Sequence, residues 1–300
     1  MAGSSLKAAL LVNFSIGVIK MVVGLATRSA AMFSEAIHSF ADTFNQILLA
    51  LGIRNSKKKP DLEHPFGYQK NQFFWSFVVA ILIFGVSGIL AFFEGYEKVL
   101  HPEEHHEGFI WNIVVLLGAM ILEFYAFKTA YNEAKAYKNK MKTETIFDAF
   151  DEMQDPVLLS LIVEDTLALI GLTTALIGVS LSYFLHEPVI DGYTSMTIGI
   201  ILMLGGLLLA KENKTYLIGK AVTHRTQELI RNTVLDFEHT KDILSMKTMM
   251  LGPKRMILAL DVRFDATEDK IPDLIDELEQ LLIKAVPYLK ANKIFIEAQN

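Results

Sequence analysis

Two ionisable residues, His38 and Asp42, lie four positions apart within an apolar stretch at residues 31–53. Residues at this spacing lie one above the other on one face of an α-helix. An imidazole and a carboxylate placed in this way can bind one divalent metal ion, and mixed nitrogen and oxygen ligands suit zinc and its neighbours. The alternative is a histidine–aspartate pair that only hydrogen-bonds to itself between helices. The spacing alone leaves both interpretations open.

Two further acids, Glu164 and Asp165, stand side by side in a second apolar stretch at residues 158–180. Adjacent acids in hydrocarbon repel and desolvate each other, so their position indicates a bound cation or proton. Successive helical residues point about 100° apart, so both acids bind one ion only if one side chain reaches around the helix. Glu123 lies in a third apolar stretch, where helix pairing and a metal or proton role are equally open.

Three other polar residues in apolar surroundings have more ordinary interpretations. We expect Lys20 to pair with an acid or to extend to the membrane surface. Asn45 extends the helix face of Asp42, and we favour a hydrogen bond to another helix over a role beside the metal. Asp191 is expected to cap the helix that begins near residue 189.

The elements that must position these residues are long apolar helices. A hydrocarbon core of about 30 Å needs about 20 helical residues. Six stretches have this length: residues 7–27, 31–53, 72–98, 109–131, 156–184 and 189–210. The alternating ten-residue pattern of a membrane barrel is absent. The sequence therefore predicts an all-α transmembrane domain of six helices over residues 1–210.

Composition separates this region from the rest of the chain. The chain is 52% hydrophobic, with a mean hydropathy of +0.34. Residues 211–300 hold 14 basic and 14 acidic residues, so the net charge of −6 belongs to the apolar region. This balance argues against nucleic acid as a partner and favours a cation. The absence of cysteine excludes thiolate metal sites, iron–sulfur clusters and disulfides.

The charges of the short loops predict the orientation in the membrane. The loops after the second and fourth stretches are basic, with Arg54, Lys57, Lys58, Lys59 and Lys70 in one and Lys135, Lys138, Lys140 and Lys142 in the other. The loop after the third stretch is acidic, with Glu103, Glu104 and Glu107. Basic short loops stay in the cytoplasm. Both termini are therefore expected there.

Residues 211–300 have the pattern of a small α+β domain. A helix is predicted at 226–237, and strands are predicted around Met246–Met250 and Met256–Phe264, where apolar residues alternate. A second amphipathic helix follows from Ile271, and a short strand includes Ile294 and Ile296. The order is αββαβ, a ferredoxin-like arrangement in two layers.

Two motifs resemble those of a known family. Residues 34–46 (SEAIHSFADTFNQ) are similar to the second-helix signature of the cation diffusion facilitators, and residues 64–70 (HPFGYQK) are similar to their His-x-Phe-Gly-x-x-Lys loop. Residues 161–171 resemble their fifth helix. The resemblance covers nearly the whole chain and points to the zinc transporter 9-like branch. It implies a homodimer in a lipid bilayer that exchanges a divalent metal for protons and is not an enzyme.

The resemblance also implies a metal site. In the family, two residues four apart in the second span and two in the fifth hold the ion, and His38, Asp42 and Asp165 match three of these positions. The fourth position is Leu161, which cannot bind metal. Glu164 is the nearest replacement, followed by Glu123 or water. Zn²⁺ is the expected substrate, but a site rich in oxygen ligands moves toward Mn²⁺, Fe²⁺ or Co²⁺, and Cd²⁺ is a further candidate.

The mechanism that follows is export from the cytoplasm by alternating access, because metal and protons compete for the same ligand atoms. A prokaryotic plasma membrane is the expected location. In the loop after the second span, Asp61 and His64 remain, but Tyr68 replaces a common histidine. Residues 211–300 are interpreted as a dimerisation domain. Two other classes stay open: an intramembrane metalloenzyme, and a metal sensor or scaffold that does not transport.

Overall fold

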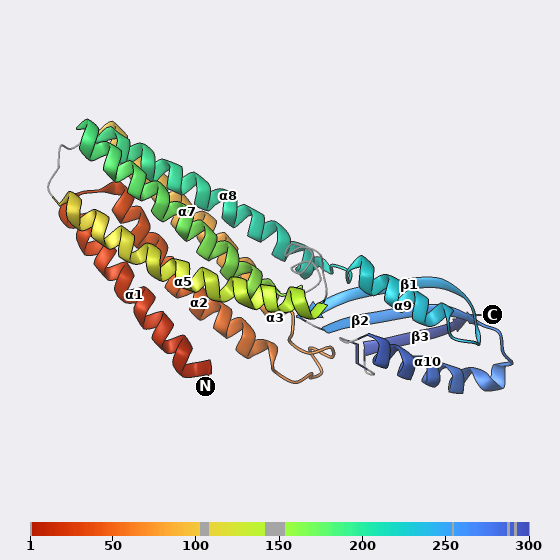
Figure 1. Ribbon diagram of the computed structural model, residues 1–300. Helices are drawn as coiled ribbons and strands as arrows, with labels where there is room; N and C mark the ends of the chain where they lie inside the picture. The colour runs from red at the N-terminus through yellow and green to blue at the C-terminus, as the bar shows by residue number, and fades with distance from the viewer. Residues whose placement is uncertain are drawn as a thin grey trace.

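Most of the chain forms a bundle of long helical segments, with a smaller sheet-containing region beyond one end (Figure 1). The structure is a computed structural model that describes residues 2–102, 108–141, 154–253, 255–286, 289–290 and 293–299. The segments are α1 (Ala2–Thr27), α2 (Ala30–Ser56), α3 (Asn71–Leu82), η1 (Ile83–Gly88), α4 (Ile89–Leu100), α5 (Phe109–Met141), α7 (Pro156–Leu185) and α8 (Val189–Ile218). The π-helical turn η1 joins α3 and α4 into one continuous segment.

Four of these segments are long and apolar enough to cross a membrane, judged by length and composition: residues 71–100, 109–136, 156–185 and 189–218. Asn13–Thr27 is a shorter apolar helix. Two helices run further than predicted, since α5 continues to Met141 and α8 to Ile218. Lys135, which we assigned to a loop, therefore lies on α5. The predicted loop residues Glu103, Glu104, Glu107 and Lys142 lie outside the described residues.

Helix α8 crosses α4 at a pair of glycines, Gly192 on α8 and Gly95 on α4. A Cβ on Gly95 would lie 2.5 Å from the carbonyl oxygen of Gly192, and a Cβ on Gly192 would lie 2.8 Å from the carbonyl oxygen of Gly95. Any larger side chain would collide at these distances, so the two backbones are in direct contact, as in other membrane helix pairs. Near this crossing, Ser195 donates a hydrogen bond to the carbonyl oxygen of Ala91 at 2.7 Å. The contact fixes α8 against α4.

The C-terminal region is a three-stranded sheet that packs against two helices. Its order is α9 (His224–Leu235), β1 (Thr240–Gly252), β2 (Arg255–Phe264), α10 (Ile271–Ala285) and β3 (Ile294–Gln299). The central strand β2 pairs antiparallel with β1 and parallel with β3. Alternate residues of β2 share one hydrophobic core with Ile230 of α9 and Leu278 of α10. The residues that alternate in the sequence are thus the ones that are buried.

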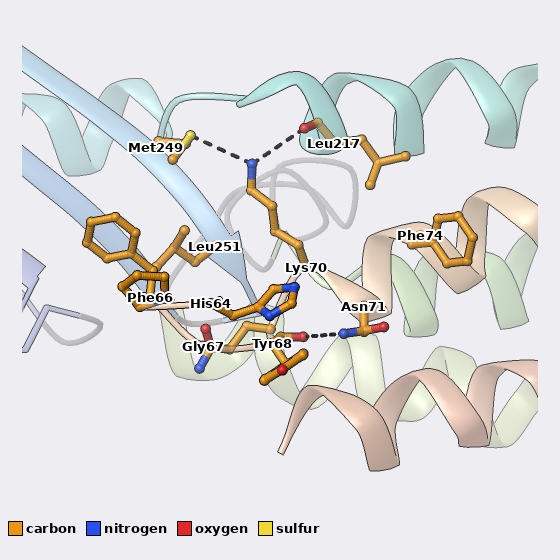
Figure 2. A pocket seen from close by; sticks show the side chains of 12 residues that line it. His64, Phe66, Gly67, Tyr68, Lys70, Asn71, Phe74, Leu217, Met249 and Leu251 are labelled. Carbon is orange, nitrogen blue, oxygen red and sulfur yellow. Dashed lines mark hydrogen bonds between the residues drawn. The ribbon is translucent and has the colours of Figure 1, made fainter. Parts of the chain in front are cut away.

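The two regions meet where α2 and α8 end (Figure 2). Lys70 Nζ, in the loop after α2, donates to the carbonyl oxygen of Leu217 at 3.4 Å. The rings of Phe73 and Tyr216 stack with their centroids 4.7 Å apart. Lys293 Nζ donates to the carbonyl oxygen of Phe66 at 3.0 Å. The basic loop after α2 therefore lies at the same end of the bundle as the C-terminal region. We call the opposite end, where α1 turns into α2, the far end.

Candidate metal centre

His38 and Asp42 lie on the buried face of α2, near the middle of the helix. His38 is 1% exposed and Asp42 is 8% exposed. His38 Nε2 is 3.5 Å from Asp42 Oδ2, which is beyond the range of a good hydrogen bond. Within the described part of the chain, neither nitrogen of His38 makes a hydrogen bond, and Asp42 Oδ1 accepts none. The two residues do not satisfy each other, which argues against a purely structural pair.

Glu164 and Asp165 occupy adjacent positions on α7 and face different surroundings. Glu164 is 3% exposed, and its Oε1 atom has no hydrogen-bond partner among the described residues. Asp165 is half-buried. The predicted divergence of the two side chains is therefore present. Leu161, one turn earlier, packs against the hydrophobic core of the bundle.

Four acids, Asp42 of α2, Glu123 of α5 and Glu164 and Asp165 of α7, are near enough to act on one another electrostatically. The carboxylate of Asp42 interacts with those of the other three. A crevice too narrow to admit water separates Asp42 from Glu123, and it is also lined by Asn13, Ile16 and Ser39. In the described ranges, no three His, Asp or Glu side chains are close enough to hold a metal ion together. The acids therefore approach Asp42 without forming a closed coordination shell.

The chemistry of the unpaired atoms fits a divalent cation. Buried polar atoms in proteins nearly always have hydrogen-bond partners. Here both His38 nitrogens, Asp42 Oδ1 and Glu164 Oε1 have none in the described residues. Asn45 of α2 approaches Glu164 of α7, which is the contact between helices expected of it, although among the described residues neither of its amide atoms reaches ordinary hydrogen-bond geometry. Nitrogen and oxygen donors from α2 and α7 are suitable ligands for zinc or manganese.

Lys20 of α1 is a fully buried cation that lies between Asp42 and the far end of the bundle. It is 1% exposed, and its Nζ donates to Glu35 Oε2 at 3.1 Å and to Ser39 Oγ at 2.9 Å. The expected pairing with an acid is confirmed. It also interacts electrostatically with His38 and Asp42. The role of Ser39 was not predicted, because a single serine on a helix carries no sequence signal for a long-range partner.

Asp191 corrects one prediction. It lies in the first turn of α8, but its side chain makes no cap there. Instead Asp191 Oδ1 accepts a hydrogen bond from Ser29 Oγ at 2.8 Å, and Oδ2 accepts one from the Ala30 amide at 2.5 Å. The carboxylate thus caps the N-terminus of α2, where free amide groups favour a negative charge. This contact ties α8 to the helix that carries His38.

The loop after α2 is an exposed site with its oxygen atoms already engaged. Tyr68 Oη donates to Asp61 Oδ2 at 2.5 Å, and the His64 amide donates to Asp61 Oδ1 at 2.8 Å. The hydrogen bond from Tyr68 holds the pKa of Asp61 below its usual range and raises the pKa of the tyrosine hydroxyl. The rings of His64 and Tyr68 lie 4.1 Å apart. Tyrosine here occupies a carboxylate oxygen that a metal would need.

Comparison with known proteins gives a consistent set of similarities. Residues 6–218 match the family described as the cation efflux transmembrane domain. The chain is 29% identical over 246 residues to the mitochondrial proton-coupled zinc antiporter SLC30A9 of Mus musculus, covering 82% of this chain and 43% of that protein. It is 26% identical over 261 residues to metal tolerance protein C4 of Arabidopsis thaliana, covering 86% and 56%. It is 25% identical over 306 residues to the manganese efflux system protein MneP of Bacillus subtilis, covering 94% and 95%. The chain thus spans less than half the length of the first of these relatives.

Proposed function

The chain belongs to the cation efflux family, and from that premise we propose that it exchanges a divalent metal cation for protons across a membrane. The family consists of transporters and not of enzymes. The observation that carries the proposal is a set of nitrogen and oxygen atoms of His38, Asp42 and Glu164 that have no hydrogen-bond partner among the described residues and lie inside an apolar bundle. Ionisable groups in such surroundings are costly and mark ion pathways.

The proposed metal ligands are His38, Asp42, Asp165 and Glu164. Asp42 of α2 belongs to the same electrostatic cluster as the two acids of α7 and Glu123 of α5. Glu164 takes the place of the ligand that Leu161 cannot supply. Zinc is the proposed substrate, and manganese, iron, cobalt and cadmium are the alternatives. Relatives named for zinc and for manganese are both similar to this chain, which supports keeping more than one metal in the comparison.

Exchange follows from the chemistry of the ligands. Carboxylates and imidazole bind a metal only after losing their protons, so binding of one cation releases the other. Metal arriving from the end near the C-terminal region would displace protons from Asp42 and its neighbours. Protons arriving from the far end would displace the metal after the helices rearrange. Asp165 is the least buried of the four proposed ligands, since the other three are buried.

We further propose that all six helical segments cross the membrane, with the basic loop after α2, the termini and the C-terminal region in the cytoplasm. The shared position of that loop and the sheet at one end of the bundle supports this orientation. Residues 1–210 would form the transport domain, with α8 extending beyond it, and residues 211–300 a dimerisation domain. The proposed assembly is a homodimer in a prokaryotic plasma membrane.

A metal sensor or scaffold is the second candidate. It is favoured by one observation: Leu161 stands where the resemblance implies the fourth ligand, so the set of ligands expected for transport is incomplete. A sensor would bind metal without carrying it across the membrane. Flux and binding measurements on the same preparation separate the two functions.

The test uses the full chain in proteoliposomes that contain a metal-sensitive dye. We expect zinc uptake to be accelerated by an opposing proton gradient, and to be lost in His38→Ala and Asp42→Ala. Glu94→Gln, which changes an acid of α4, is the matched control and should transport normally. Binding without flux would favour the sensor, and flux that ignores the pH gradient would contradict exchange. Comparing Glu164→Gln with Glu123→Gln identifies the fourth ligand.

A further inference from the structure

The ion pair between Lys20 and Glu35 lies between the proposed metal centre and the far end. On α2, Ser39 and Glu35 both precede Asp42. Ser39 is three residues before it and Glu35 seven residues before it, which corresponds to roughly 4.5 and 10 Å along a helix. The N-terminus of α2 is at the far end (Figure 1). On α1, Lys20 follows Asn13 and Ile16, which line the crevice beside Asp42. The pair therefore stands next to the metal centre on the side opposite the C-terminal region.

This pair fills the space between three helices. Lys20 belongs to α1 and donates to both Glu35 and Ser39 of α2. The other oxygen of Glu35 faces α7, where a Cβ added to Gly171 would lie 2.7 Å from Glu35 Oε1. Glycine at this position leaves the carboxylate room against the backbone of α7. Two of these helices, α2 and α7, carry the proposed ligands, so any widening among the three helices on the far side has to separate or move this pair.

At the same level, α2 contacts α8 in a different way. The hydroxyl groups of Ser34 and Ser195 are in hydrogen-bond contact, and Ser195 also donates to the Ala91 carbonyl oxygen. These side chains are uncharged and join α2 to α8. They provide a matched control: a buried polar contact at the same depth that does not border the crevice.

We propose that the Lys20–Glu35 pair is the far-side gate of the transport pathway. This inference rests on the proposed function, because a gate implies a path through Asp42. When the pair is formed, the ammonium and carboxylate exclude water from the space between Asp42 and the far end. When α1 moves away from α2, the two charges separate, and each becomes exposed to the water that carries protons in and metal out. Lys20 and Glu35 are positioning residues, and neither binds the metal.

The chain lacks cysteine, so accessibility can be measured with a single introduced thiol. Asn13→Cys places that thiol in the crevice beside Asp42. A membrane-impermeant thiol reagent is added to the far side of proteoliposomes without metal. We expect slow labelling in the Asn13→Cys protein and labelling about tenfold faster when Lys20→Ala and Glu35→Ala are added, which corresponds to a gate easier to open by about 1.4 kcal/mol.

Three further variants separate a gate from a structural contact. The charge swap Lys20→Glu with Glu35→Lys should restore slow labelling. Ser34→Ala with Ser195→Ala should leave labelling slow. Gly171→Ala, which pushes on the Glu35 carboxylate without removing a charge, should speed labelling and keeps the test decisive if the double alanine variant does not fold. A merely structural pair would not change accessibility from one side.

The proposal is overturned if the thiol is labelled equally fast with and without the pair, or if the serine variant opens the crevice as far as the alanine variant does. Because labelling needs no metal flux, this result is independent of transport. A parallel flux assay on the unaltered chain tests the proposed function. Loss of flux with the expected labelling pattern would contradict transport alone.

Discussion

Among the described residues, several polar groups in the far half of the bundle are held in contacts between helices, whereas most of the buried ligand atoms around Asp42 lack a hydrogen-bond partner. Toward the far end, Lys20 pairs with Glu35, and Asp191 of α8 caps α2. Thr27 of α1 donates to Asn112 of α5 at 3.0 Å. Near Asp42, buried nitrogen and oxygen atoms stay without partners among the described residues. The same helices thus carry a paired layer that holds them together and an unpaired set that is available for an ion.

This difference predicts opposite consequences for two similar-looking substitutions. Removing a charge from a paired group should destabilise the fold, because its partner remains buried alone. Removing a charge from the unpaired set should abolish function while leaving the metal-free fold intact. The following predictions test that separation, beginning with the largest expected effect.

Asp42→Asn is expected to reduce metal transport by at least about 100-fold, since even residues that only support a metal ligand often cost 10- to 100-fold. The melting temperature of the metal-free protein in detergent should not fall, because no partner is left behind. Asp61→Asn, an acid in the exposed loop, serves as the control. Normal flux in Asp42→Asn would remove Asp42 from the site.

Lys20→Met should lower the free energy of unfolding by about 3–5 kcal/mol, the usual cost of leaving one member of a buried ion pair alone. Adding Glu35→Gln should recover part of this loss, because the unpaired charge is then removed. Thermal unfolding in detergent measures both variants. Equal stability of Lys20→Met and the unaltered chain would mean that the pair contributes nothing to the fold.

Metal should stabilise the unpaired set. At a free metal concentration of about 100 times its Kd, the free energy of unfolding should rise by about 2.7 kcal/mol. The increase should shrink as pH falls, because protons compete for the ligands. Unfolding with and without zinc or manganese, at two pH values, measures this. Asp42→Asn should lose the effect and Lys20→Met should keep it.

Asp191→Ala should destabilise the protein by about 1–3 kcal/mol, because the Ala30 amide and Ser29 hydroxyl lose a buried acceptor. Asp191→Asn should lie between the alanine variant and the unaltered chain, since an amide oxygen still accepts a hydrogen bond. Asp236→Ala, at the end of α9, is the control outside the bundle. An unchanged melting temperature would show that α2 does not depend on this cap.

Tyr68→Phe should have the smallest effect, because Asp61 is exposed. Loss of the hydroxyl donor should raise the pKa of Asp61 toward its ordinary value of about 3.9, as measured by carboxyl NMR titration. Asp61 has its low pKa only in the folded protein, so its contribution to stability is present above that ordinary value and is lost as pH falls through the folded pKa. An unchanged titration would contradict the role of the hydrogen bond.

Several features follow from local patterns in the sequence. Alternation along β2 places its buried residues correctly, because strand side chains alternate between faces whatever the strand packs against. The four-residue spacing of His38 and Asp42 puts both on one helix face for the same reason. The pairing of Lys20 with some acid follows from the cost of a lone charge in an apolar bundle. Even the divergence of Glu164 and Asp165 is a property of the helix alone.

Other features were decided only by the packing of distant helices. Glu35 is the partner of Lys20, 15 positions away in the sequence. Asp191 caps α2 instead of its own helix, by a contact with Ala30, which is 161 positions away. Packing equally determines that the His38 nitrogens and Asp42 Oδ1 have no hydrogen-bond partner among the described residues. A helix fixes which residues share a face, since each turn repeats locally. Which face meets which neighbour depends on how all the helices fill the bundle together, and no short stretch of sequence contains that information.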